Sequence, residues 1–268
     1  MRFDAFVGVD FSGARDAGRR IWIARGREDA SRLAVQSVVP ATALPGGGPG
    51  PEAAWAALRA AIAAARDSLV GIDMPFGLPL AVVAESDWRG FVAAFAARHA
   101  DADSFRAAMC AFGFGEAKRR TDVETKTPFG GWNVRMYRQT YAALSHVLAP
   151  LVAADAVRAA PMQPPAPGKP VLIEVCPAST LKHAGLYFPY KRRGADGAAA
   201  RAAILDGLTA RGAVAPLPAG LRAVVLADPG GDALDAVIAA ASAFKARDDA
   251  GLATPRDARE AIEGRVFY

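Results

Sequence analysis

The sequence contains few of the residues that cross-link small folds or bind zinc. Among its 268 residues are only two cysteines, Cys110 and Cys176, and three histidines. The cysteines lie far apart and show no Cys-x-x-Cys spacing, which argues against a disulfide framework and a structural zinc site. The histidines also lack the mutual spacing of zinc ligands.

The sequence also lacks long apolar runs and two common catalytic motifs. No window approaches 18 apolar residues free of charge and proline, so we expect no membrane span. The first residues, MRFDAFVGVD, are interrupted by Asp4, unlike a signal peptide, and we expect a cytoplasmic protein. There is no GxxxxGK[ST] phosphate loop, and no GxSxG elbow supports a Ser-His-Asp triad.

The composition indicates a folded protein with a large core. Hydrophobic residues make up 52% of the chain, and many of them are alanines, which favour helices packed closely on a sheet. The net charge of +5 is compatible with a polyanionic partner. Arginines scattered along the chain do not by themselves make a binding patch, however, and the oligomeric state is left open.

The first half of the sequence predicts a sheet that begins with three antiparallel strands. Strands are expected over Phe3 to Asp10, over RRIWIAR and over Leu33 to Val39, because short connections join them. A helix opening at Pro51 follows, and SLVGIDMP then predicts a fourth strand. In the second half of the sequence, a fifth strand is expected over Val171 to Val175 and a last helix in GDALDAVIAAASAFKAR.

Residues 79–165 show mainly helical periodicity around a basic, glycine-containing stretch. We interpret this segment as a helical insertion in a single domain that spans residues 1–268. A helix through VRMYRQTY would place Arg135 and Arg138 on one face.

Acidic residues stand at the ends of apolar runs in an unusual pattern. The runs VGVD, VGID and VLIE end at Asp10, Asp73 and Glu174, and a carboxylate in an apolar strand is costly unless it is paired or bound to metal. Each acid alone has a plain structural explanation, but three together indicate a site. Two more, Asp232 and Asp235, can share one face of the last helix. Asp232 is also expected to cap that helix, whereas Asp235 lies inside it.

Several blocks of the sequence resemble a known family. They are VGVDFSGA, GIDMPFGLP, EVCPASTLK, YKRRGADG, GGDALDAVIAAASAFKA and EGRVFY, in that order along the chain. Together they resemble the domain of unknown function 429 (DUF429) family, which is regarded as a predicted ribonuclease H-like nuclease. The resemblance implies an α/β fold with a ribonuclease H-like mixed sheet, in which strands 1–3 are antiparallel and later strands parallel, flanked by helices.

The resemblance also implies roles for the acids. Asp10, Asp73 and Asp235 would hold Mg²⁺ or Mn²⁺, with Asp232 and, less directly, Glu174 as further catalytic acids. Carboxylate oxygens are the ligands that these hard cations prefer, and acids from different elements are what two-metal phosphoryl transfer needs.

Basic and polar residues near these motifs are candidates for contacts with phosphates and bases. These substrate-binding candidates are Ser12, Lys126, Arg135, Arg138, Gln139, Lys182 and Lys191. A solvated helix face with a packed aromatic side explains the basic segment around residues 118–141 equally well.

Three functions follow as hypotheses. The leading one is a metal-dependent nuclease that hydrolyses the phosphodiester bonds of nucleic acid. The second is a catalytically silent nucleic-acid or protein binding module that keeps the fold. The third is phosphoryl transfer on an actin or sugar-kinase architecture, which would need two duplicated domains where this chain shows one set of strands.

Overall fold

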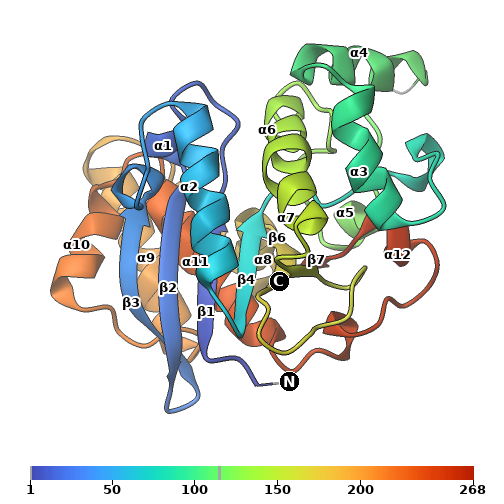
Figure 1. The fold of residues 1–268 in the computed structure, drawn as a ribbon. Helices are drawn as coiled ribbons and strands as arrows, with labels where there is room; N and C mark the ends of the chain where they lie inside the picture. The colour runs from blue at the N-terminus through green and yellow to red at the C-terminus, as the bar shows by residue number, and fades with distance from the viewer. Residues whose placement is uncertain (1, 114–115) are drawn as a thin grey trace.

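The structure is a computed structural model that describes residues 2–113 and 116–268, and its centre is a seven-stranded mixed sheet (Figure 1). The strand order is β3-β2-β1-β4-β6-β5, and β7 pairs with β6. The strands are β1 (Ala5–Asp10), β2 (Trp22–Asp29), β3 (Arg32–Pro40), β4 (Ser68–Asp73), β5 (Arg158–Ala159), β6 (Val171–Val175) and β7 (Val266–Phe267).

The sheet is antiparallel at one end and parallel at the other. β1, β2 and β3 form an antiparallel meander, whereas β4 lies parallel to β1, and β6 lies parallel to β4, β5 and β7. This confirms the predicted mixed sheet flanked by helices. The carboxyl ends of β1, β4 and β6 therefore meet at one edge of the sheet.

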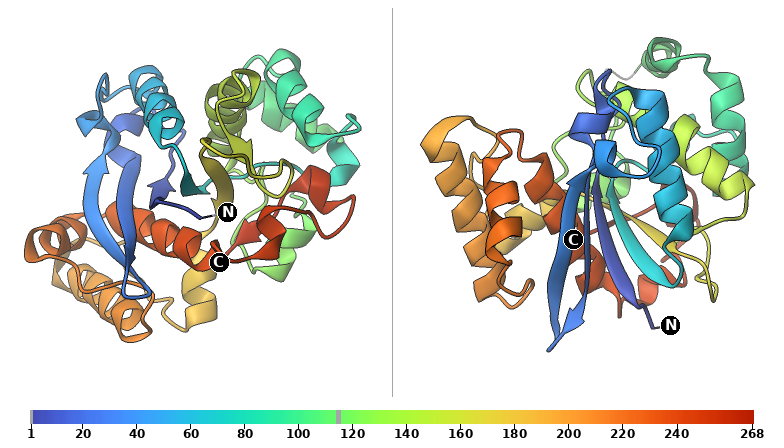
Figure 2. Two further views of the ribbon diagram at one scale, coloured as in Figure 1. Left: turned by 60° about the horizontal axis from the view of Figure 1, so that its bottom comes forward. Right: turned by 60° about the vertical axis from the view of Figure 1, so that its left-hand side comes forward.

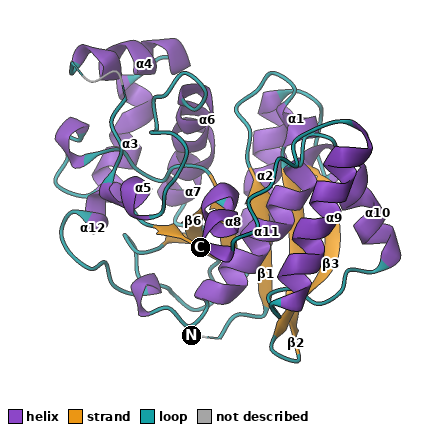
Figure 3. Cartoon of the chain, turned by 180° about the vertical axis from the view of Figure 1, so that it is seen from behind, coloured by secondary structure: helices purple, strands orange, loops and turns teal. Residues whose placement is uncertain are grey.

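Helices cover both faces of the sheet (Figures 2 and 3). One face packs against α11 (Asp232–Ala246), with α9 (Gly194–Ala210) and α10 (Ala219–Ala227) on the same side. The other face carries α2 (Pro51–Ala64) and the helices between β4 and β5 that share its core, namely α3 (Trp88–Arg98), α4 (Ala102–Ala111), α6 (Tyr137–Ala142) and α7 (Ala149–Ala153). The remaining helices are α1 (Ala17–Arg20), α5 (Arg120–Glu124), α8 (Pro177–Ala184) and α12 (Glu260–Glu263).

Four short helical turns complete the described part of the chain. Three are 3-10 turns and one is a π-helical turn between α6 and α7, and they are η1 (Ala41–Ala43), η2 (Leu80–Val82), η3 (Ala143–Leu148) and η4 (Ala250–Leu252). None of the helices in the described part of the chain is long and apolar enough to cross a membrane.

Two glycines let α11 lie directly on the sheet. A Cβ atom at Gly8 would lie 2.0 Å from the carbonyl oxygen of Ala236 and 2.1 Å from the nitrogen of Ala240, and one at Gly71 would lie 2.7 Å from the carbonyl oxygen of Ala239. Any side chain there would collide with helix backbone, so only glycine permits this approach. Each glycine stands two residues before the acid that ends its strand. The close contact therefore brings the first turn of α11 to the sheet edge that carries Asp10 and Asp73.

Several boundaries differ from the sequence prediction. The second strand begins at Trp22, because Arg19 and Arg20 belong to helix α1. The two-residue strands β5 and β7 were not predicted, since so short a run shows no alternation of apolar and polar residues. Between β4 and β5 the elements are helical, and the division of the chain into domains stays a prediction.

Candidate active site at the carboxyl ends of the strands

Asp10 and Asp73 are neighbours at the ends of two parallel strands. They are the last residues of β1 and β4, and Asp10 lies opposite Asp73 in the strand register. Side chains two residues apart share a face of a sheet. Phe6 in β1 and Leu69 in β4 pack in the core beneath α11, so the two aspartates point to the face that α11 covers.

Helix α11 adds two more carboxylates from its first turn. Asp235 is only 1% exposed, and its Oδ1 accepts a hydrogen bond of 2.6 Å from the Tyr190 hydroxyl. The Lys191 ammonium lies 2.6 Å from Asp235 Oδ2. Asp232 is half-buried and lines the same cleft.

The prediction that Asp232 caps α11 is wrong. The helix begins at Asp232 itself, and Gly231 is the capping position, without a side-chain hydrogen bond. The Asp228 carboxylate instead accepts a 2.8 Å hydrogen bond from the nitrogen of Ala233 and a 3.1 Å bond from that of Gly230. An aspartate four residues upstream therefore satisfies this helix end, and the Asp232 carboxylate remains directed at the cleft.

Burial and mutual repulsion raise the pKa values of these carboxyl groups. Burial, followed by the neighbouring Asp235 charge, raises the pKa of Asp10 well above its usual range and that of Asp73 to about 7. Burial also raises the pKa of Asp235, and raises the pKa of Asp232 to about 6 with help from Asp228. Burial acts to lower the pKa of Lys191, but the Asp235 and Asp10 charges outweigh it and raise that pKa.

The donor set suits a hard divalent cation. Among the described residues, Lys191 alone forms an ion pair with any of the four aspartates, so negative charge is in excess. Carboxylate oxygens are the preferred ligands of Mg²⁺ and Mn²⁺. As the side chains stand, no three acidic, histidine or cysteine groups in the described part of the chain are arranged to enclose a metal ion. A cation would therefore bind with adjustment of these side chains and of the Lys191 ammonium.

Glu174 lies at the same edge but on the opposite face of the sheet. It pairs in register with Ile72, whose side chain packs in the core away from α11. Its carboxylate is bound by both terminal nitrogens of Arg119, with Nη1 at 2.7 Å from Oε2, and accepts a 2.9 Å bond from the nitrogen of Phe76. Burial raises the pKa of Glu174, and Arg119 opposes that rise. Glu174 therefore lines the same cleft as the four aspartates, but from the opposite face of the sheet and with its carboxylate paired to Arg119.

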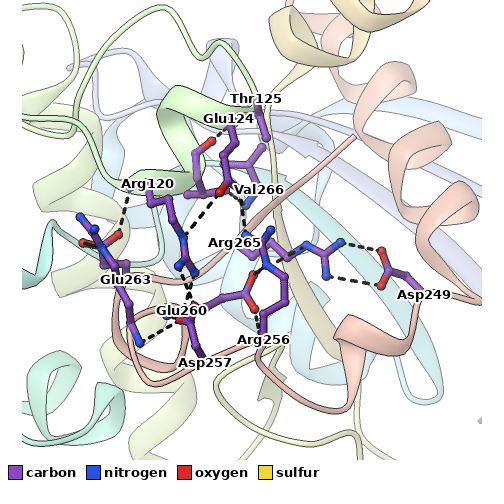
Figure 4. Close-up of polar contacts among 12 residues, drawn as sticks. Arg120, Glu124, Thr125, Asp249, Arg256, Asp257, Glu260, Glu263, Arg265 and Val266 are labelled. Atoms are coloured by element: carbon purple, nitrogen blue, oxygen red, sulfur yellow. Dashed lines mark hydrogen bonds and ion pairs between the residues drawn. The ribbon is translucent and has the colours of Figure 1, made fainter.

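Arg119 is held in turn by two other segments. Its guanidinium also binds Asp122, at 2.8 Å, and donates to the carbonyl oxygen of Glu263 at 3.0 Å. The residues around Glu263 form a polar network that fastens the C-terminal segment to α5 (Figure 4). In it the Glu263 carboxylate accepts from the nitrogen of Arg120 at 3.1 Å, and the nitrogen of Val266 donates to the Thr121 hydroxyl at 2.8 Å.

A cleft of about 710 Å³ opens over the acids, and some of the predicted substrate-binding residues line it. It is lined by Ser12, Arg135, Gln139 and Lys191 together with all five predicted acids. Gln139 Nε2 donates to the carbonyl oxygen of Asp73 at 2.7 Å. Ser12 Oγ accepts a 3.2 Å bond from the nitrogen of Ala14 within its own turn.

The other three predicted substrate-binding residues, Lys126, Arg138 and Lys182, are not among the residues that line the cleft. Lys182 Nζ donates to the carbonyl oxygen of Lys126 at 2.8 Å, and Arg138 lies 3.7 Å from Asp103. The expected shared helical face of Arg135 and Arg138 is wrong, because α6 begins at Tyr137. Arg135 precedes it in a turn, where its nitrogen donates to the Asn133 side chain at 2.9 Å.

Sequence reasoning did not single out Arg201, Tyr187 or Phe188. Arg201 is 2% exposed and donates to the carbonyl oxygens of Tyr190, Arg192 and Leu226, so it fixes the segment that carries Lys191. Nothing local in the sequence marks Arg201, since its partners lie elsewhere along the chain. The aromatic residues beside the basic run in LYFPYKRR were a usable signal.

The fold and site define an α/β protein with a carboxylate-rich cleft where its parallel strands end. The model of the DUF429 family, described as a protein of unknown function, matches residues 8–260. The chain therefore belongs to this family. The searches of curated proteins and of solved structures give no match.

Proposed function

We propose that this protein is a metal-dependent nuclease that hydrolyses phosphodiester bonds of nucleic acid in the cleft. The observation that carries the proposal is the meeting of Asp10, Asp73 and Asp235 at one sheet edge, with raised carboxyl pKa values and with Lys191 as the one ion-pair partner among the described residues. Such an excess of buried negative charge favours a bound cation.

Each residue has a role in this proposal. Asp10, Asp73 and Asp235 would hold Mg²⁺ or Mn²⁺, and Asp232 would assist from the same helix turn. When bound, the metal supplies positive charge for phosphate oxygens and lowers the pKa of a water molecule. Gln139 donates to the backbone at Asp73, and Arg135, which lines the cleft, would bind phosphate.

The test is cleavage of end-labelled DNA and RNA, single-stranded and duplex, with Mg²⁺ or Mn²⁺ present. We expect the wild-type chain to cleave at least one of these substrates, and Asp73→Asn to lower the rate at least about 100-fold, because even residues that only orient metal ligands contribute about 10–100-fold.

Asp29→Asn is the matched control for this assay. Asp29 is an exposed carboxylate at the far end of β2, whereas the near end of that strand pairs with Asp10. The control should cleave as the wild type does. Cleavage by Asp73→Asn at the wild-type rate would refute the carboxylate mechanism, and absence of cleavage by the wild-type chain on all substrates would favour a binding module.

A further inference from the structure

Two neighbouring aromatic residues lie at the cleft, in the loop between α8 and α9. Tyr187 is 51% exposed and Phe188 is 42% exposed, and both line the cleft that contains the carboxylates. We call this pair the aromatic rim. Exposed aromatic rings forgo the free energy of burial, so adjacent ones beside a polar site indicate a contact surface.

The residues on both sides of the aromatic rim are buried and anchored. Leu186 before it is 5% exposed and packs so closely on α9 that a Cβ atom at Gly207 would lie 2.5 Å from it. Tyr190 after it is 4% exposed, bonded through its hydroxyl to Asp235 and through its carbonyl oxygen to Arg201. The backbone that carries the two exposed rings is therefore anchored at both ends, which reduces the ordering cost of a ligand that stacks on them.

Cations accompany the aromatic groups around the cleft. The Lys182 ammonium lies 5.3 Å from the centre of the Tyr187 ring, and Arg192 lines the cleft next to Lys191. From the segment before α6, the Arg135 guanidinium lies 5.4 Å from the Phe129 ring, and both line the cleft as well. Within residues 2–113 and 116–268, none of Lys182, Arg192 and Arg135 forms an ion pair with a carboxylate. Their charges are available to a phosphate backbone.

From this arrangement we infer that the ligand of the cleft is single-stranded nucleic acid, with unpaired bases stacked on Tyr187 and Phe188. Bases in a duplex already stack on one another, so only unpaired bases offer a face to an aromatic side chain. A cleft of about 710 Å³ also falls in the range of small-molecule sites, about 300–1,000 Å³, and accommodates only a short piece of strand. This inference rests on the proposed function and narrows its substrate.

The experiment measures binding separately from cleavage. Fluorescence anisotropy of labelled single-stranded DNA, single-stranded RNA and a DNA hairpin duplex is titrated with the full chain in EDTA, which keeps the strands intact. Repulsion between phosphates and the metal-free carboxylates is the same for every variant compared and cancels. We expect at least one single strand to bind tighter than the duplex. The double variant Tyr187→Ala, Phe188→Ala should weaken that binding by roughly 5- to 150-fold per lost stacking contact.

Two matched variants define the role of the rings. Phe112→Ala removes an equally exposed aromatic ring, at 51%, from the end of α4 outside the cleft and should leave affinity unchanged. Tyr187→Phe keeps the ring and should retain most of the affinity. Thermal melts show that each variant is folded.

Three results would overturn the inference: tighter binding of the duplex, equal loss of affinity in Phe112→Ala, or no binding of any nucleic acid. The first, combined with cleavage that depends on Asp73, would leave the nuclease proposal intact and refute only the single-strand preference. The third, combined with absence of cleavage, would refute both.

Discussion

Replacement of Arg119 by methionine is expected to lower the free energy of unfolding by about 3–5 kcal/mol, because it leaves buried carboxylates without their partner. Arg119, Asp122 and Glu174 are 3%, 3% and 4% exposed, and the arginine contacts both acids. The loss of the bond to the Glu263 carbonyl oxygen adds to the cost, because it removes one of the contacts that hold the C-terminal segment. Urea unfolding of wild type and variant at pH 7.5 measures the difference.

The neighbouring arginine provides the control. Arg120 pairs with Asp257 at 2.6 Å, but their side chains are 30% and 45% exposed. Exposed ion pairs contribute less than about 1 kcal/mol, so Arg120→Met should cost little. A triple variant with Arg119→Met, Asp122→Asn and Glu174→Gln should recover part of the lost stability, because no unpaired charge remains. Equal costs for Arg119→Met and Arg120→Met would contradict this account of the buried group.

Replacement of Asp73 by asparagine is expected to stabilise the metal-free protein at alkaline pH. An aspartate in the unfolded chain has a pKa of about 3.9, whereas in the folded chain the pKa of Asp73 is raised to about 7. Between these values the folded chain binds a proton that the unfolded chain has released, so stability falls as the pH rises from about 4 to about 7. The full shift corresponds to at most about 4 kcal/mol. Since the side chain is only half-buried, solvent screens part of this energy. We therefore expect Asp73→Asn to raise the free energy of unfolding by about 2–3 kcal/mol at pH 8.

The measurement is denaturant unfolding in EDTA at pH 4, 6 and 8. The gain from Asp73→Asn should be full at pH 8, partial at pH 6 and small at pH 4, where the folded-state carboxyl is protonated and the unfolded-state carboxyl is about half protonated. Asp29→Asn, at an exposed position, should give no gain at any pH. A stability loss from Asp73→Asn that is largest at pH 8 would mean that the ionised carboxylate stabilises the fold, contrary to the expected repulsion.

The central strands were predictable because they are short continuous apolar runs, and the central helix because its alanine-rich run is long. The runs that end at Asp10, Asp73 and Glu174 all form strands, and the alanine-rich run after Gly231 forms α11. The pairing order of the strands and the short strand β7 depend on contacts between distant segments. Val266 pairs with Glu174, for example, and no local pattern reports such a contact.

The acids of the site were predictable as residue types, but their partners were not. Alternation along β6 turns Glu174 to the face opposite that of Asp10 and Asp73, and this follows only once the register with β4 is known. Its partner Arg119 lies 55 residues away, and Lys191 and Asp235 are likewise joined only by the fold. The start of α6 at Tyr137 depends on the turn at Asn133. Because this turn precedes the helix, Arg135 and Arg138 do not share the helical face that the periodicity predicts.

The most direct test of the account is titration calorimetry with Mn²⁺ on the wild-type chain, on Asp29→Asn and on the double variant Asp10→Asn, Asp73→Asn. The account predicts Mn²⁺ binding by the wild type and by Asp29→Asn, and its loss in the double variant, because the two aspartates at the ends of β1 and β4 supply the carboxylates of the site. Binding of Mn²⁺ with the same affinity in all three proteins, or in none of them, would contradict the assignment of these acids to a metal site.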